Sequence, residues 1–254
     1  MAHIEYEHVD NWLDLALRID DYFTHYDSYI FRGQADSEWK LEPGLTRVLN
    51  RIYKKYSEKK SAIQAHKEQF RENIRGRTTL DLRTISDDEL WALGQHFGLL
   101  TPLLDWTRSP YVAVFFSLFG PCESGNRALW AIVENDIERL RKNRKGEKNN
   151  IYVINPLTHY NERLVNQRGL FVNVPASANL EEWVKEGDDQ GWISMYKITY
   201  PDSIRNDALS ALNNRNINHL SLFPDVYGSS KYANYQLEIE PYLENARKKS
   251  PWNE

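Results

Sequence analysis

Residues 95–109 read QHFGLLTPLLDWTRS, a stretch in which polar and ionisable side chains interrupt apolar sequence. A strand or helix that only stabilises a fold alternates apolar and polar residues with a period of 2 or 3.6. This stretch follows neither period, and burying a polar side chain without a partner costs free energy. The interrupting side chains are Gln95, His96, Asp105, Thr107, Arg108 and Ser109. They predict either a buried polar network or a binding site.

The composition around this stretch is that of a folded, mildly acidic protein. Of the 254 residues, 41% are hydrophobic and 13% aromatic, and no Ser/Gly/Pro-rich linker divides the chain. We therefore expect one domain over residues 1–254. The 32 Lys and Arg against 36 Asp and Glu give a net charge of −4, which does not favour binding to a nucleic acid or an anionic membrane. Residues 49–77 are basic, but interspersed acids favour a solvated helix or helical pair there over a phosphate-binding surface.

The cysteine and histidine content bears on compartment and metal binding. Cys122 is the one cysteine, so the chain forms no internal disulfide and no cysteine-based zinc site, and we expect a reducing, cytoplasmic compartment. The first residues do not resemble a signal peptide, and no apolar run approaches about 18 residues, so we expect no membrane association. No histidine pair has the spacing of a zinc signature. We therefore expect no metal cofactor.

Periodicity and capping signals predict several helices. Apolar spacings of three and four residues predict an amphipathic helix over 9–24, and residues 203–216 have a helical pattern. Ser86 and Glu89 have the spacing of a capping box and predict a helix that extends to Gln95-His96. The apolar run 111–119 fits a buried helix or a buried strand. Its Ser109-Pro110 start favours the helix.

Short β-rich runs predict the strands. They lie at residues 29–31, 128–133, 151–154, 170–174 and 192–198, and the polar residues 141–148 predict a surface loop between two of them. Few helices separate these runs, so we expect an α+β fold with a mixed or antiparallel central sheet and a helical N-terminal part. The chain contains neither of the two common glycine-rich phosphate-binding motifs.

Several motifs together resemble the FRG domain family, which takes its name from a Phe-Arg-Gly tripeptide. The resemblance extends over about residues 29–232. Its motifs are Phe31-Arg32-Gly33-Gln34, Trp39 to Pro43 with Arg47, Gln95 to Leu99, Leu103 to Thr107, Arg163, Gln167 to Phe171 and Leu222 to Gly228. The family is known mainly as a sequence pattern of bacteria and phages. The resemblance therefore implies membership more than a particular reaction.

A weaker similarity is to ADP-ribosyltransferases of the arginine-serine-glutamate type. In those enzymes an aromatic-Arg-Gly element on the first core strand positions NAD, and Phe31-Arg32-Gly33 looks like it. Thr107-Arg108-Ser109 is a loose match to their Ser-Thr-Ser element. Their third element is a glutamate, and here Gln167 lies near a predicted strand without the negative charge of a carboxylate. Glu238 and Glu240 lie beyond the last family motif.

Each candidate side chain has a functional and a structural interpretation. Arg32 offers a planar charged fork for pyrophosphate, with room beside Gly33 for a ligand, or else forms a buried pair with Asp105. His96 is a general base, a ribose ligand or a structural histidine at a helix end. Asp105 must find hydrogen-bond donors, in a site or as a helix cap. Ser109 contacts a ligand or caps the next helix.

The similarity to ADP-ribosyltransferases implies an NAD-using ADP-ribosyltransferase-like enzyme, acting as a toxin or an anti-phage effector on a protein or nucleic acid. Its catalytic candidates are Arg32, His96, Asp105 and Gln167, and its cofactor-binding candidates are Arg32, Gln34, Gln95, Thr107 and Ser109. NAD is the expected substrate, and a partner protein or antitoxin is an expected partner. The alternative is a non-catalytic module that senses a nucleotide or a protein.

Overall fold

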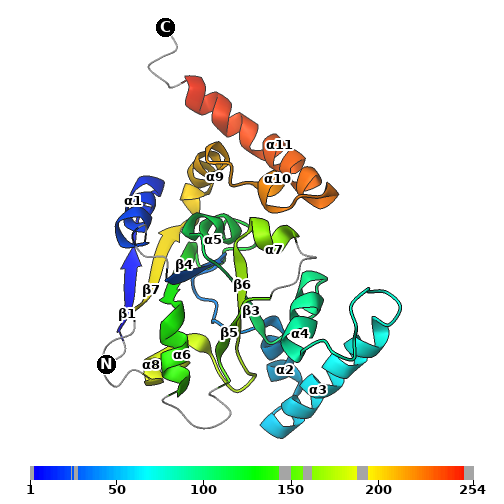
Figure 1. The fold of residues 1–254 in the computed structure, drawn as a ribbon. Helices are drawn as coiled ribbons and strands as arrows, with labels where there is room; N and C mark the ends of the chain where they lie inside the picture. The colour runs from blue at the N-terminus through cyan, green and yellow to red at the C-terminus, as the bar shows by residue number, and fades with distance from the viewer. Residues whose placement is uncertain are drawn as a thin grey trace.

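The structure is a computed structural model that describes residues 3–23, 25, 28–142, 150–156, 162–187 and 194–248. One twisted sheet forms its centre, with helices against both faces (Figure 1). In the described residues the strands are β1 (His3–His8), β2 (Tyr29–Gln34), β3 (Leu103–Thr107), β4 (Asn126–Val133), β5 (Tyr152–Ile154), β6 (Gly169–Asn173) and β7 (Ser194–Pro201).

The strand order across the sheet is β1-β7-β4-β2-β3-β6-β5. Within the part of the chain that the structure describes, β1 and β7 are paired in parallel and the five other pairings are antiparallel. This confirms the predicted α+β class and mixed sheet. β1 was not predicted, because its sequence HIEYEH contains few apolar residues.

The described residues also contain helices. They are α1 (Trp12–Phe23), α2 (Gly44–Ile52), α3 (Tyr56–Asn73), α4 (Asp87–His96), α5 (Pro110–Ser117), α6 (Glu134–Lys142), α7 (Glu162–Asn166), α8 (Leu180–Gly187), α9 (Arg205–Asn214), α10 (His219–Leu222) and α11 (Val226–Lys248), with a 3-10 turn at Asp202–Ile204 before α9. None of the helices in the described part of the chain is long and apolar enough to cross a membrane.

Local signals fixed several boundaries as predicted. The Ser86 hydroxyl accepts from the Glu89 amide, and the Glu89 carboxylate accepts from the Ser86 amide, so the capping box is confirmed. Ser109 accepts from the Val112 amide, and the 111–119 run begins as helix α5. Residues 49–77 form parts of two helices, α2 and α3. Of the predicted 192–198 strand, positions 192 and 193 lie outside the described residues, as do 143–148 of the predicted loop.

Two large apolar clusters hold the sheet between its helices. On one face, α1, α5 and α9 pack around Phe31, Leu129 and Tyr200. On the other face, α6 and α8 pack around Trp130 and Ile30. A smaller cluster places α2 and α4 over the outer strands β3, β6 and β5. The outer strands β3, β6 and β5 and the helices α2 and α4 thus share an apolar cluster of their own, next to β2.

Gly33 serves packing and not ligand access. A Cβ atom at this position would lie 1.9 Å from the carbonyl oxygen of Ala113 in α5. Helix α5 therefore approaches the backbone of β2 directly, and only glycine allows this contact. The space predicted beside Gly33 for a ligand is occupied by α5.

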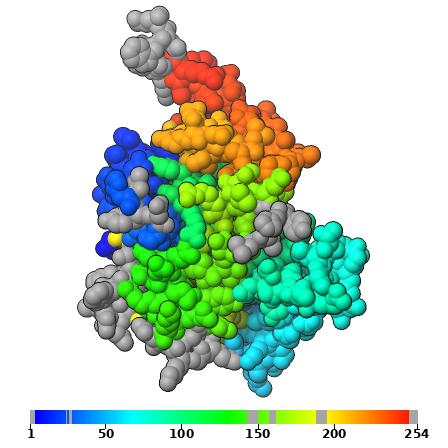
Figure 2. All heavy atoms as spheres, viewed as in Figure 1, coloured from blue at the N-terminus to red at the C-terminus, as the bar shows by residue number. Residues whose placement is uncertain are grey.

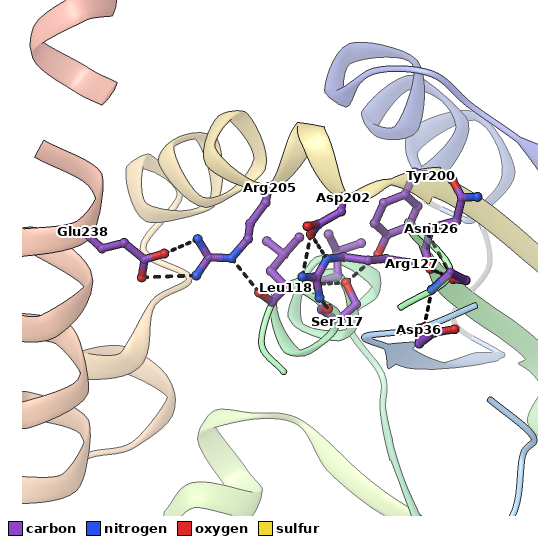
Figure 3. Close-up of polar contacts among 11 residues, drawn as sticks. Asp36, Ser117, Leu118, Asn126, Arg127, Tyr200, Asp202, Arg205 and Glu238 are labelled. Atoms are coloured by element: carbon purple, nitrogen blue, oxygen red, sulfur yellow. Dashed lines mark hydrogen bonds and ion pairs between the residues drawn. The ribbon is translucent and has the colours of Figure 1, made fainter. Parts of the chain in front are cut away.

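Two arginines fix the C-terminal end of α5 (Figure 3). The buried Arg127 side chain donates to the Ser117 carbonyl and, through Nε, to Asp202 Oδ1 at 2.6 Å. Arg205 donates from Nε to the Leu118 carbonyl at 2.9 Å. Both therefore satisfy carbonyls that a helix end leaves unpaired. Arg205 also pairs with Glu238, which ties α11 to the same point.

Candidate functional site

Strands β2 and β3 separate after a single paired position, Phe31 with Thr107. Continued antiparallel pairing would place Gly33 opposite Asp105, but no such pair forms. Instead Nη1 of Arg32 donates to the main-chain carbonyl of Asp105 at 2.7 Å. The Asp105 carbonyl, which would accept from a β2 amide if the strands stayed paired, thus accepts from the Arg32 guanidinium instead.

A cavity of about 240 Å³ lies at this separation. Its polar lining comes from β2, β3, α4 and the segment that enters α2. The polar residues are Arg32, Glu42, Arg47, Gln95, Thr101 and Asp105, and Gly44 lines the cavity beside them. Leucines 99, 100, 103 and 104 provide apolar walls. Two cationic and two carboxylate side chains therefore meet in one small space.

The Arg32 guanidinium is fixed by one hydrogen bond and keeps a second donor, Nε, without a partner in the described residues. The side chain is 19% exposed, and Nε is buried. Burial lowers the pKa of the guanidinium, the Asp105 carboxylate opposes this shift, and the charge of Arg47 adds to it. An arginine nevertheless stays protonated in proteins. An anion in the cavity would relieve both the unpaired donor and the repulsion between the two arginines.

Arg47 approaches the cavity from the first turns of α2. Its Nη1 donates to the Glu42 carbonyl at 2.9 Å, and the rest of the side chain is exposed. Gly44, at the start of α2, also lines the cavity, and no side chain caps that helix. The sequence did not single out Arg47 as a site residue. The Pro43-Gly44 helix start was the available signal, since it places residue 47 in the first turn.

A chain of hydrogen bonds orients the Asp105 carboxylate. Gln95 Nε2 donates to Asp105 Oδ1 at 3.0 Å, and the Thr101 hydroxyl donates to Gln95 Oε1. The Thr101 hydroxyl in turn accepts from the Leu103 amide at 3.2 Å. Asp105 Oδ2 lies 3.9 Å from Arg32 Nη1, and its side chain is 66% exposed. Gln95 and Thr101 thus fix which way the carboxylate faces, and sequence reasoning missed Thr101.

The structure brings Arg32, Gln95 and Asp105 together and places Gln34 elsewhere. Gln34 lies in the core, where its Oε1 accepts from Trp130 Nε1 at 2.7 Å and its Nε2 donates to the Lys40 carbonyl. Its side chain alternates to the same face of β2 as Arg32, two residues on. The polar group of Gln34 is thereby used within the fold.

Thr107 and Ser109 make local contacts at the other end of β3. The Thr107 hydroxyl donates to the Gln167 carbonyl at 2.7 Å and accepts from the Ser109 amide. Ser109 caps α5, which is its structural interpretation. In the register of the sheet, Thr107 lies between Phe31 of β2 and Gly169 of β6. The Arg32, Thr107 and Gln167 elements therefore lie on three neighbouring strands.

His96 and Gln167 belong to a second polar cluster near α7. Burial and the charge of Arg163 lower the pKa of His96, and Asp225 opposes the shift. Arg163 Nε donates to Asp225 Oδ2 at 2.9 Å, and Gln167 Nε2 donates to the Leu222 carbonyl at 3.1 Å. These bonds join α7 to the segment between α10 and α11. His96 lines a larger, mainly apolar cavity of about 780 Å³ instead of the Arg32 cavity.

Residues 27–125 match the family model of the FRG domain. Over this segment the chain is similar to the FRG domain family. The matched segment contains all six polar residues that line the Arg32 cavity, from Arg32 to Asp105. No curated protein and no solved structure matches the chain. Within the described residues, no group of three or more His, Cys, Asp and Glu side chains has a metal-binding arrangement.

Proposed function

We propose that this protein is an NAD-using ADP-ribosyltransferase-like enzyme whose substrate pyrophosphate binds in the Arg32 cavity. The observation that carries the proposal is the Arg32 guanidinium at the separation of β2 and β3, with its buried Nε unpaired in the described residues. Arg47 adds a second positive charge to the same cavity. Paired arginines suit a phosphate group because their planar forks donate two parallel hydrogen bonds.

The positions of the strands support the same proposal. The similarity to ADP-ribosyltransferases assigns Arg32, the Thr107 segment and the Gln167 segment to one NAD site. Phe31, Thr107 and Gly169 form a continuous row across β2, β3 and β6. Three segments that lie far apart in sequence therefore meet on one part of the sheet, which is what a shared substrate requires.

The two carboxylates of the cavity are the groups suited to the chemical step. In that step the bond between the ribose C1 and the nicotinamide nitrogen breaks, and its electron pair leaves with nicotinamide. A nucleophile of the acceptor then forms a bond to C1. The positive charge that develops on the ribose is stabilised by an oriented carboxylate. Asp105, held by Gln95, and Glu42 line the cavity, so these replace the missing glutamate of the third element.

A nucleotide or protein sensor is the second candidate function. It is favoured by the hydrogen bonds that Gln167 and Asp105 already form within the fold. Gln167 lacks a charge and uses its amide on the Leu222 carbonyl. Asp105 already has Gln95 and Arg32 as partners. A cavity with two arginines, in which the Asp105 carboxylate already has partners, suits binding without turnover. A toxin or anti-phage role is compatible with either function.

Incubation of the purified protein with NAD separates the two functions. We expect nicotinamide release, and transfer of label from NAD phosphate to a component of cell extract. The Arg32→Gln variant should lose both, whereas Arg18→Gln, on the exposed side of α1, should retain them. A rise in the melting temperature with NAD but without release would support the sensor. If NAD neither raises the melting temperature nor releases nicotinamide, both the transferase and an NAD sensor are contradicted.

A further inference from the structure

A basic stripe begins at the mouth of the Arg32 cavity and continues along α2 into α3. Residues 47–60 contain six basic side chains and one acidic side chain, in a chain whose net charge is −4. The basic residues are Arg47, Arg51, Lys54, Lys55, Lys59 and Lys60. This local charge is opposite in sign to that of the chain as a whole.

The fold gathers the cations of α2 on one exposed side. Leu45 and Leu49 are buried against the outer strands. Arg47 and Arg51, four residues apart, lie above one another on the opposite, exposed side. Lys59 joins them from α3, because its Nζ donates to Asn50 Oδ1 at 2.6 Å. We call Arg47, Arg51, Lys54 and Lys59 the α2 basic stripe.

Acidic neighbours do not neutralise the α2 basic stripe. Arg51 and Lys54 have no ion pair within the described part of the chain. Glu58, the one acid of the segment, caps α3 by accepting from the Lys55 amide. The other acids of α3, which led the sequence analysis to favour a solvated helix or helical pair, lie in its second half. There Glu68 and Glu72 pair with Arg71 and Arg75.

A shallow groove with an aromatic wall runs beside the stripe. It has a volume of about 490 Å³ and lies between Tyr53 and the first turns of α3, where Ser57, Glu58, Ser61, Ala62 and Ala65 line it. The α2 and early α3 segment lies at the lower right of the molecule in Figure 2. A positive track next to an aromatic ring is the arrangement that binds single-stranded nucleic acid, with phosphates on the track and a base on the ring.

We propose that the α2 basic stripe and its groove bind single-stranded nucleic acid. Phosphates contact Arg51, Lys54 and Lys59, and a base lies against Tyr53. An anionic membrane is the poorer fit, because a helix that lies on a membrane needs an exposed apolar face, and α2 buries its leucines. Because Arg47 also lines the Arg32 cavity, this ligand would be the acceptor of the proposed transferase. That last role alone rests on the proposed function.

The test is fluorescence anisotropy with labelled 20-nucleotide single-stranded RNA and DNA. The test variant is Arg51→Gln with Lys54→Gln, and both residues lie outside the Arg32 cavity. The matched control is Arg75→Gln with Arg77→Gln, which removes the same charge at the far end of α3. That end is about 27 Å away along an 18-residue helix. Urea unfolding checks that all variants are folded.

We expect the test variant to bind at least 10-fold more weakly and the control to change less than 3-fold. With four stripe cations, the plot of log affinity against log salt should have a slope of about −3, falling to about −1.5 in the test variant. NAD binding should be retained in the test variant, so failure of the NAD proposal would leave this result intact. No binding at 50 mM salt, equal weakening in the control, or binding only to phosphatidylserine vesicles would overturn the proposal.

Discussion

Arg32 Nη1 donates to the main-chain oxygen of Asp105 at 2.7 Å, across the point where β2 and β3 separate. This bond lets the sheet stay connected while its two halves open around a cavity. The same guanidinium keeps a buried donor that nothing in the described residues uses. Arg32 is therefore both a structural link and the main anion-binding group, and these two roles can be separated by substitution.

Substitution of Arg32 tests this double role. Arg32→Lys keeps the positive charge but loses the planar fork, so we expect a 10- to 100-fold weaker affinity for a phosphate ligand, as for a lost charged hydrogen bond of about 1.5–3 kcal/mol. Stability should fall as well, because the Asp105 carbonyl loses its donor. Titration calorimetry with NAD and urea unfolding measure the two effects. Unchanged affinity together with reduced stability would leave Arg32 only its structural role.

Gly33→Ala should disrupt the packing of α5 on the sheet. The added Cβ would lie 1.9 Å from the Ala113 carbonyl oxygen, which belongs to helix backbone and cannot move aside alone. We expect a loss of about 3 kcal/mol or more, or failure to fold. Gly44→Ala is the matched control, since its nearest neighbour is a flexible leucine atom at 3.2 Å. Equal stability of the two variants in urea would show that the contact is not tight.

The Arg127–Asp202 pair should respond asymmetrically to substitution. Arg127 is 3% exposed and the Asp202 side chain is 46% exposed. Asp202→Ala leaves a buried charge without its partner and should cost about 3–5 kcal/mol. Arg127→Met leaves a carboxylate that water can reach and should cost less, about 1–3 kcal/mol for the unpaired Ser117 carbonyl. The more exposed Arg18–Glu7 pair is the control, and Arg18→Ala should cost less than about 1 kcal/mol. A larger loss of stability in Arg127→Met than in Asp202→Ala would contradict this prediction.

Stability should fall as the pH drops below about 6.5, the ordinary pKa of histidine. Burial, followed by the charge of Lys231, lowers the pKa of His219, which packs against Phe115 and Phe119. The folded protein therefore resists a proton that the unfolded chain accepts. This contribution to stability is fully present above pH 6.5 and is lost as the pH falls towards the lowered pKa.

His219→Gln should flatten that pH dependence, which reaches at most about 1.4 kcal/mol per pH unit for one group. Urea unfolding at pH 7.5, 6.5 and 5.5 measures it, with His8→Gln, at an exposed position, as the control. His96, whose pKa burial and Arg163 also lower, should contribute in the same direction. If His219→Gln and the wild type lose stability in parallel on acidification, His219 does not contribute.

The parts of the fold that local signals control were predictable. The Ser86 and Ser109 caps and the alternating strands each act over a few residues, so periodicity and capping identified them. Strands β1 and β3 were not predicted, and neither were helices α6, α7, α8, α10 and α11. β1 has few apolar residues and depends on its parallel pairing with β7. The apolar residues from 232 onward gave no clear pattern, and Ile239 packs into the main core from helix α11.

The candidate site was predictable only in part. Arg32, Gln95 and Asp105 were singled out by their polarity and by the family resemblance, and they meet at one cavity. Arg47 and Thr101 were missed because their roles depend on where α2 and the α4–β3 turn place them. Gln34 and Thr107 are also polar, but their side chains form hydrogen bonds within the fold, with Trp130 and with the Gln167 carbonyl. Sequence identifies polar groups, and only the tertiary contacts say which of them are free.

Titration calorimetry of the wild type and Arg32→Gln with NAD and with nicotinamide riboside, which lacks phosphate, tests the central claim most directly. The proposed pyrophosphate site predicts that the wild type binds NAD at least 10-fold more tightly than the riboside. Arg32→Gln should reduce NAD affinity to the level of the riboside and leave riboside binding unchanged. Equal binding of NAD by the wild type and a folded Arg32→Gln variant would contradict the account.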